Sequence, residues 1–172
     1  MFICHNYKTV SKYIILKIKL ITIGKTDDTA LNGLINTYTS RLKHYIKFEF
    51  HIIPDIKNRK RLRFEEQKVK EGELLLKEIE KSDFVILLDE KAKEYTSVSF
   101  SKFLSKKMLS GVKQIVFIIG GPYGFSEDIY KRANQKISLS KMTFSHQMVR
   151  LFFVEQLYRG FTILKNEPYH HR

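Results

Sequence analysis

The apolar residues of this chain follow two alternating periods. Short, mostly apolar runs typical of β-strands alternate with segments whose apolar residues recur every three or four positions, as in amphipathic helices. Two runs, 84–88 and 114–119, are apolar at nearly every position, which indicates strands buried on both faces of a parallel sheet. The predicted strands are 18–23, 48–53, 84–88, 114–119 and 137–139, and the predicted helices begin near Asp27 or Asp28, Phe64, Thr96 or Ser97, Ser126 and His146.

Strands that alternate with helices in this way predict a single α/β domain with a mainly parallel sheet. The chain has 172 residues, of which 43% are hydrophobic, and this suffices for one well-filled domain. No apolar run approaches the about 18 residues of a membrane-spanning helix, so we expect no membrane partner. The single cysteine, Cys4, excludes a disulfide framework and a multi-cysteine metal site, and it favours a cytoplasmic location.

The first residues do not share the alternating pattern. Residues 1–16 hold the only cysteine and no acidic residue, and their apolar run from Tyr13 is cut by Lys17. That run is too short for the core of a signal peptide. We therefore interpret residues 1–16 as an N-terminal extension of a domain that spans 17–172.

The charge of the chain is strongly positive. Thirty-one Lys and Arg residues face 18 Asp and Glu residues, for a formal net charge of +13. Nucleic acid is the commonest large anionic partner of such a protein, although a lysine-rich genome composition would give the same number. The densest basic segment has five cations in seven residues, and we expect it to bind RNA phosphates unless it is simply a solvated loop. Its cations are Lys57, Arg59, Lys60, Arg61 and Arg63.

Three loops leave the carboxyl ends of predicted parallel strands, which is where α/β sheets bind ligands. They follow Leu88, Ile119 and Leu139. The second loop, 120–124, reads Gly-Gly-Pro-Tyr-Gly, and its glycines would let a ligand approach the backbone closely. It matches neither a P-loop nor a dinucleotide fingerprint, and alone it is more typical of a tight strand-to-helix connection.

The end of the chain is dense in side chains that could carry chemistry. His146 and Arg150 follow the third loop, Arg159 lies further along the last predicted helix, and the tail contains Tyr169 and His170. Taken singly, these residues are typical of helix caps and surface charge pairs.

Taken together, these segments closely resemble the RlmH family of bacterial ribosomal RNA methyltransferases, within the SPOUT superfamily. The resemblance runs from about Lys17 to the C-terminus, and one departure is Gly160, where the family pattern has Ala. It implies a SPOUT fold with a C-terminal deep trefoil knot, which periodicity alone would not suggest. The matching motifs are Ile119–Gly124, Leu139–His146, Val149–Leu151, Glu155–Arg159 and Pro168–His170.

The resemblance also implies that S-adenosylmethionine is the cofactor, with S-adenosylhomocysteine as product and no metal. Leu88 would border the adenine, and Gly120 and Gly121 would contact the cofactor through backbone atoms. The third loop would wrap around the adenine and methionine groups. Its predicted cofactor-binding residues are Leu139, Ser140, Lys141, Met142, Thr143 and Phe144.

The implied reaction is methyl transfer to N3 of a pseudouridine in a 23S rRNA hairpin loop. Because N3 must lose a proton before it attacks, the site needs a base or cations that stabilise the developing charge. The candidates are His146, Arg150, Tyr169 and His170, with His170 or Tyr169 favoured as proton acceptor. Arg150 and Arg159 would hold a phosphate or a uracil carbonyl. Alternatively, the tail merely closes over the cofactor.

The resemblance implies a homodimer that acts on 23S rRNA in the large subunit or the 70S ribosome. The tail or basic region of one copy would complete the cofactor pocket of the other. The apolar run 151–154 would lie either in the core or at the dimer face. Two alternatives are a SPOUT methyltransferase with another RNA target such as tRNA, and an inactive RNA-binding SPOUT protein.

Overall fold

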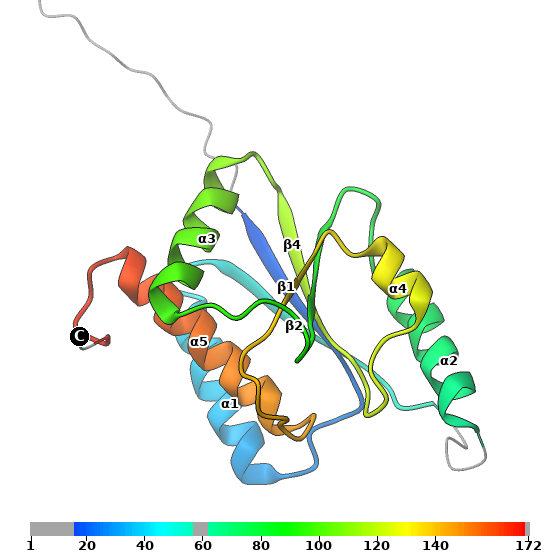
Figure 1. Cartoon of the computed structure of the whole chain (residues 1–172). Helices are drawn as coiled ribbons and strands as arrows, with labels where there is room; N and C mark the ends of the chain where they lie inside the picture. Colours follow the sequence, from blue (N-terminus) through cyan, green and yellow to red (C-terminus); the bar gives the residue numbers. More distant parts are fainter. Residues whose placement is uncertain (1–15, 57–61, 171–172) are drawn as a thin grey trace, which may run out of the picture.

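Five parallel strands form the centre of the molecule (Figure 1). The computed structural model describes residues 16–56 and 62–170. The sheet has the order β2-β1-β4-β3-β5, and every pair of neighbouring strands is parallel, which confirms the predicted α/β class. The strands are β1 (Lys17–Ile23), β2 (Lys47–Ile53), β3 (Phe84–Leu88), β4 (Gln114–Ile119) and β5 (Gln135–Ile137).

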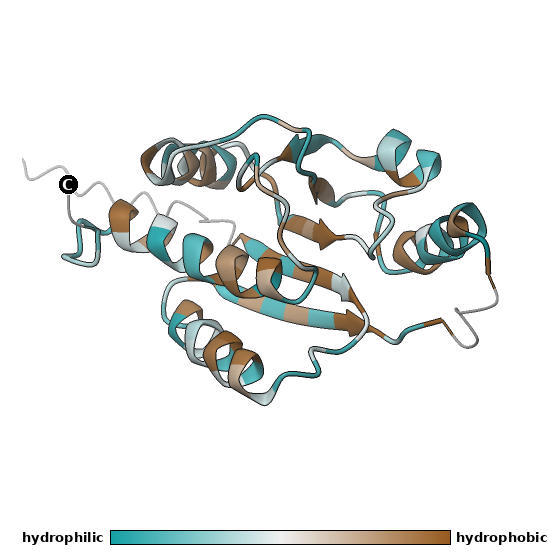
Figure 2. Ribbon diagram, turned by 60° about the horizontal axis from the view of Figure 1, so that its bottom comes forward, coloured by the Kyte–Doolittle hydropathy of each residue, from teal (hydrophilic) through white to brown (hydrophobic). Residues whose placement is uncertain are grey.

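Helices cover both faces of the sheet. One face packs against α1, α3 and α5, and the other packs against α2 and α4. Figure 2 shows apolar residues concentrated on the central strands and on the helix surfaces that face them. The result is a three-layer α/β domain with one core on each side of the sheet. The helices are α1 (Thr29–Leu42), α2 (Phe64–Lys77), α3 (Ser97–Leu109), α4 (Glu127–Arg132) and α5 (Met148–Leu164).

Most predicted elements lie where the pattern put them, and the exceptions have local causes. Strand β5 begins and ends two residues earlier than predicted, because Ser138 bridges Glu94 outside the strand. Helix α5 begins at Met148 instead of His146, since the Ser145 hydroxyl accepts a hydrogen bond from the Met148 amide at 3.2 Å. Leu16, assigned to the extension, is 2% exposed in the core, whereas residues 1–15 lie outside the described part of the chain.

The apolar run 151–154 belongs mainly to the core. Phe153 and Val154 are completely buried, and only Phe152 is substantially exposed, at 38%. Gly160 lets α3 lie close to α5, because a Cβ at this position would stand 3.0 Å from Leu104 Cδ1. In the described residues, no helix is long and apolar enough to cross a membrane.

The loop after β3 lies beside the chain segment that follows β5. The Asp89 amide donates to the Ile137 carbonyl at 3.0 Å, and the Ser138 amide donates to the Lys93 carbonyl at 2.9 Å. These bonds hold the two loops together at the carboxyl edge of the sheet. The trefoil knot remains a prediction of the family resemblance.

Candidate functional site

The three predicted ligand loops meet at the carboxyl edge of the sheet and line one cavity of about 670 Å³. This volume lies within the range of small-molecule and cofactor sites. All the predicted cofactor-binding residues except the exposed Lys141 line it, and His146 and Tyr123 lie on its wall as well. The lining includes Leu88, Asp89, Glu90, Ile119–Phe125, Tyr130, Ser138–Ser140, Met142–His146, Val149 and, from α2, Lys68.

The glycine loop after β4 is a tight turn supported from behind by α2. The Gly124 amide donates to the Gly121 carbonyl at 3.1 Å, and Gly124 has a φ of +80°, which favours glycine. A Cβ on Gly121 would lie 2.3 Å from Glu71 Oε2. Glu71 is 3% exposed and accepts a hydrogen bond from Gln67 Nε2 at 2.7 Å. Gly121 therefore allows the loop backbone to rest directly on a buried carboxylate.

The opposite wall, residues 138–146, is ordered by its own hydroxyl groups. The Ser138 hydroxyl donates to the Ser140 carbonyl at 2.8 Å, and Ser140 Oγ accepts from the Met142 amide at 3.0 Å. Thr143 Oγ1 donates to Glu90 Oε2 at 2.8 Å, which links this wall to the loop after β3. Phe144 packs on Phe152 of α5, with ring centroids 4.8 Å apart.

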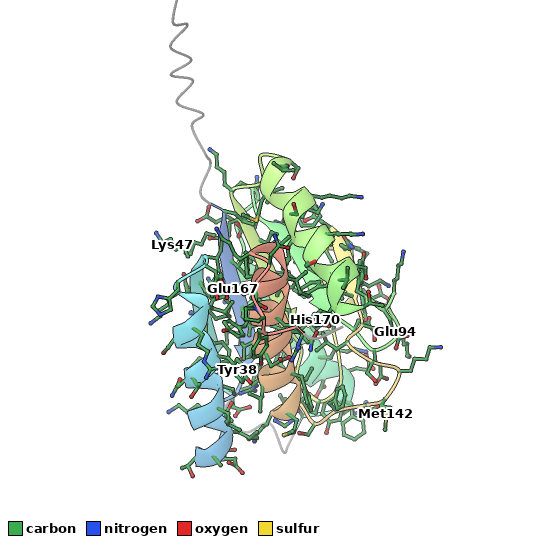
Figure 3. The ribbon with its side chains drawn as sticks, turned by 90° about the vertical axis from the view of Figure 1, so that its left-hand side faces the viewer. Tyr38, Lys47, Glu94, Met142, Glu167 and His170 are labelled. Atoms are coloured by element: carbon green, nitrogen blue, oxygen red, sulfur yellow. The ribbon has the colours of Figure 1, made fainter. Side chains whose placement is uncertain are left out.

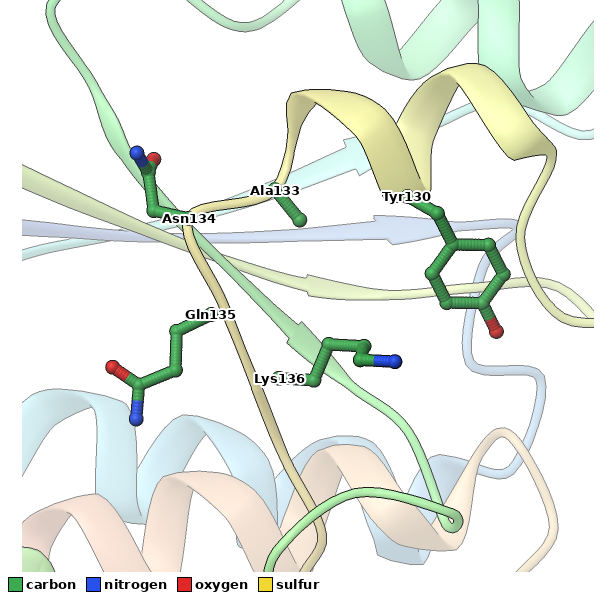
Figure 4. Close-up of a pocket in the computed structure, with 5 residues that line it drawn as sticks. All are labelled: Tyr130, Ala133, Asn134, Gln135 and Lys136. Atoms are coloured by element: carbon green, nitrogen blue, oxygen red, sulfur yellow. The ribbon is translucent and has the colours of Figure 1, made fainter.

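Tyr130 separates the cavity from a second hollow. Its hydroxyl donates to Asp89 Oδ2 at 2.8 Å, and burial together with this hydrogen bond raises the pKa of Tyr130 to about 12. The second hollow has a volume of about 340 Å³ and is lined by Tyr130, Ala133, Asn134, Gln135 and Lys136 (Figure 4). Asn134 accepts the Val85 amide at 2.8 Å and Gln135 donates to Tyr95 at 2.9 Å, so these side chains serve the fold.

The C-terminal tail forms a separate cluster on α1 and α5, which we call the tail clamp: Tyr38, Glu155, Arg159 and Tyr169. Figure 3 shows Glu167 and His170 folded back over α5, apart from Met142 on the cavity loop. Tyr169 donates to Glu155 Oε1 at 2.9 Å, and its hydroxyl lies 3.3 Å from that of Tyr38. Arg159 Nε donates to the same Glu155 oxygen at 3.1 Å, and its guanidinium lies 4.6 Å from the Tyr169 ring centroid.

The predicted catalytic residues are therefore not brought together within one chain. His146 lines the cavity, whereas no described residue after Val149 does so. Arg150 is 1% exposed and donates to Ile23 O at 2.7 Å and Thr26 Oγ1 at 2.9 Å. It therefore binds the end of β1 and does not line the cavity. Burial lowers the pKa of Arg150, and the nearby negative charges of Asp55 and Asp27 partly offset this by raising it. His170 has a buried Nδ1 with no hydrogen-bond partner among the described residues.

The predicted RNA-binding cations are likewise not all gathered on one described surface. Lys57, Arg59, Lys60 and Arg61 lie outside the described residues. Arg63 is exposed directly before α2, where its amide donates to Glu66 at 3.0 Å. Arg159 is only partly exposed and is committed to Glu155 in the tail clamp. Arg63 is therefore the one predicted RNA-binding cation that the described structure presents on an open surface.

Sequence reasoning missed two features of the site. Glu71 sits in a helix rich in charged residues, and nothing in its spacing distinguishes it from the exposed Glu73. Tyr123 and Phe64 are far apart in sequence, yet their rings stack in the structure with centroids 4.3 Å apart. Within residues 16–56 and 62–170, no group of three or more His, Cys, Asp or Glu residues is arranged to hold a metal ion.

Comparison with known proteins identifies the family of this chain. Residues 16–170 match the family model described as predicted SPOUT methyltransferase. Ribosomal RNA large subunit methyltransferase H from Christiangramia forsetii is 65% identical over 157 residues, which cover 91% of this chain and 100% of the relative. The proteins of the same name from Flavobacterium johnsoniae and Parabacteroides distasonis are 66% and 61% identical; each match covers 91% of this chain, and 100% and 99% of the respective relative. The motif-based resemblance is confirmed, and the chain belongs to the SPOUT methyltransferase family, in its ribosomal RNA large subunit methyltransferase H branch.

Proposed function

We propose that this protein transfers the methyl group of S-adenosylmethionine to N3 of a pseudouridine in a 23S rRNA hairpin loop. The observation that carries the proposal is the cavity that residues 120–124 and 138–146 enclose at the carboxyl edge of the sheet. It occurs in a chain about two-thirds identical to proteins named ribosomal RNA large subunit methyltransferase H. The substrate is the large subunit or the 70S ribosome, which places the enzyme in the cytoplasm.

The residues of the cavity fit this cofactor. A Cβ on Gly120 would stand 3.1 Å from the Phe125 ring and 3.2 Å from the Gly124 carbonyl, so the loop presents backbone where a side chain would crowd it. Leu88, Leu139 and Phe144 supply apolar surface for an adenine ring. The carboxylates of Asp89 and Glu90 favour a cationic ligand. When bound, S-adenosylmethionine supplies a methyl group on a positively charged sulfonium, which is already electrophilic.

The chain must also accept the N3 proton of the target base, and His170 is the residue we assign to this step. Tyr169 is a poor acceptor, because burial and its hydrogen bonds to Tyr38 and Glu155 raise the pKa of its hydroxyl and keep it protonated. It acts instead as a positioning residue that fixes the tail next to His170. His146, on the cavity wall, is the alternative acceptor.

We assign Arg150 and Arg159 positioning roles. Arg150 ties α5 to the end of β1 through Ile23 and Thr26, and so sets where α5 begins beside the cavity. Arg159 holds Glu155 and the Tyr169 ring. Neither guanidinium needs to touch RNA for its loss to reduce activity.

We propose a homodimer in which the tail of one copy reaches the cavity of the other. This proposal rests on the separation of His170 from the cavity lining within a single chain. Closed two-fold dimers are the commonest assemblies in which two copies exchange such contributions.

Methyl transfer to ribosomes that lack the modification tests the function. We expect methylation of one pseudouridine of 23S rRNA, located by mass spectrometry of the digested RNA. Methylation of tRNA, with none of ribosomes, would favour a different RNA target. If calorimetry detects no binding of S-adenosylmethionine, the protein is an RNA-binding member of the fold without this activity.

A further inference from the structure

Two large aromatic side chains are stacked on each other and exposed to solvent at the edge of the cavity. Phe64, the first residue of α2, is 63% exposed, and Tyr123, in the glycine loop, is 41% exposed. Their ring centroids are 4.3 Å apart and their planes differ by 27°. Because each ring uses only one face in this contact, the outer faces remain available to a further flat ring.

The position of this pair joins the cofactor cavity to a basic surface. Tyr123 belongs to the cavity lining, and so does Lys68, one helical turn after Phe64. Arg63 is exposed directly before Phe64, and α2 begins beside the turn that follows β4 (Figure 1). Lys91, on the loop after β3, adds a further exposed cation to the cavity lining.

We propose that the Phe64–Tyr123 pair stacks an unpaired base of the RNA that flanks the nucleotide to be methylated. The inference rests on the proposed function and adds a recognition element to it. Single-stranded RNA is recognised by aromatic side chains that stack its bases, while nearby cations bind the phosphates. The exposed aromatic pair and the exposed Arg63 beside it provide both parts.

The chemistry around the pair favours RNA over a protein partner. Two rings offer far less apolar area than the roughly 1,200 Å² buried in a stable protein interface. Their surroundings are charged: Arg63, Glu65, Glu66 and Lys68 all lie within five residues of Phe64. The acids are engaged locally, because Glu65 pairs with Lys68 at 2.7 Å and Glu66 accepts the Arg63 amide. The net charge of residues 62–70 remains positive.

The first test replaces Phe64 and Tyr123 with Ser, singly and together, and measures methylation of unmodified 70S ribosomes. Loss of a stacked base weakens binding by about 5- to 150-fold, so we expect the double variant to raise KM for ribosomes about tenfold or more. Phe64→Ser alone, which lies outside the cofactor cavity, should keep kcat within about twofold. The Phe64→Tyr and Tyr123→Phe variants keep the rings and should retain the wild-type KM. The matched control is Leu109→Ser, which removes an apolar side chain that is 84% exposed at the end of α3.

Two further measurements separate stacking from charge and from cofactor binding. The double variant should keep the salt dependence of ribosome binding, whereas Arg63→Glu should reduce its slope, since only the latter removes a phosphate contact. Calorimetry should give the same affinity for S-adenosylmethionine in Phe64→Ser and the wild type, because Phe64 lies outside the cavity lining.

The proposal is overturned if the double variant is folded and active with an unchanged KM for ribosomes. It is also overturned if the variants change the oligomeric state, since the pair would then be an interface between copies. If the wild type itself methylates no ribosome, the proposed function fails instead. Should the double variant not fold, the wild type is titrated into a single-stranded RNA containing 2-aminopurine. Quenching of that fluorescence by the wild type and less quenching by Phe64→Leu support stacking; no quenching by the wild type refutes it.

Discussion

Helix α5 connects two regions of very different construction. At its beginning lies the cavity, built from loop backbone, glycines and exposed side chains such as His146 and Met142. Toward its end lies the tail clamp, in which Glu155 accepts hydrogen bonds from both Arg159 and Tyr169. The cavity is an open hollow lined by loop backbone, whereas the side chains of the clamp bind one another.

This difference fits two separate tasks: the cavity is built to bind a small molecule, and the tail clamp is built to position a side chain. A cofactor site needs backbone and apolar surface that a small molecule can reach, and it is therefore left open. A tail that must present one side chain to another molecule needs to be held still, and it is therefore tied down by several side chains. The tail clamp is thus suited to presenting His170 to the cavity of a second copy, as the proposed dimer requires.

The largest expected effect comes from Gly121→Ala at the cavity. The new Cβ would stand 2.3 Å from Glu71 Oε2, so either the loop or the buried carboxylate must move. We expect roughly 10- to 100-fold weaker binding of S-adenosylmethionine, measured by calorimetry. Gly33→Ala is the matched control, because nothing lies within 4 Å of its Cβ. Equal affinities for both variants and the wild type would show that Glu71 does not support the loop.

A smaller effect, on kcat and not on cofactor affinity, is expected from Tyr169→Phe in the tail clamp. The variant loses the hydrogen bond to Glu155 and the contact with the Tyr38 hydroxyl, but it keeps the ring beneath Arg159. We expect kcat to fall about tenfold while the affinity for S-adenosylmethionine stays unchanged. Weaker cofactor binding in this variant would contradict the separation of the two regions.

The pH dependence of stability should reflect Tyr130 at the cavity. The folded protein keeps Tyr130 protonated up to a pKa of about 12, whereas an unfolded tyrosine ionises near pH 10. Its contribution is present below pH 10 and is lost as the pH rises toward 12, because the folded state then binds more protons. Unfolding by urea at pH 9 to 11.5 should show a shallower decline for Tyr130→Phe than for the wild type. If the free energy of unfolding declines in parallel in the two proteins, the environment of Tyr130, including its hydrogen bond to Asp89, does not contribute to the pH dependence.

The smallest expected effect is that of Gly160→Ala, which directly follows the clamp residue Arg159 on α5. Alanine favours the helix by about 1 kcal/mol over glycine, but its Cβ would stand 3.0 Å from Leu104 Cδ1. We expect the two effects to nearly cancel and the free energy of unfolding to change by less than about 0.5 kcal/mol. Thermal unfolding measures this. A loss of 2 kcal/mol or more would mean that α3 cannot adjust at this contact.

The hydrophobic pattern predicted the sheet class and most element positions, because strands such as β3 and β4 are buried on both faces and leave a continuous apolar signal. Leu34 shows the limit of the pattern: it has helical spacing, yet it is 48% exposed at the outer edge of α1. The cavity loops could be predicted because parallel strands place their carboxyl ends together. The tail clamp, the buried Glu71 and the Phe64–Tyr123 stack depend on contacts between distant segments, which a local pattern does not encode.

In the proposed dimer, the cofactor cavity and the tail that serves it come from different copies of the chain. Mixing two inactive variants tests it most directly: Leu88→Arg, which obstructs the cavity, and His170→Ala, which lacks the proton acceptor. Each variant should be inactive alone on unmodified ribosomes. After subunit exchange at equal amounts, half the dimers are mixed and each has one intact composite site, so the account predicts about a quarter of wild-type activity. If the mixture remains inactive although mixed dimers have formed, the cavity and the tail do not act between copies.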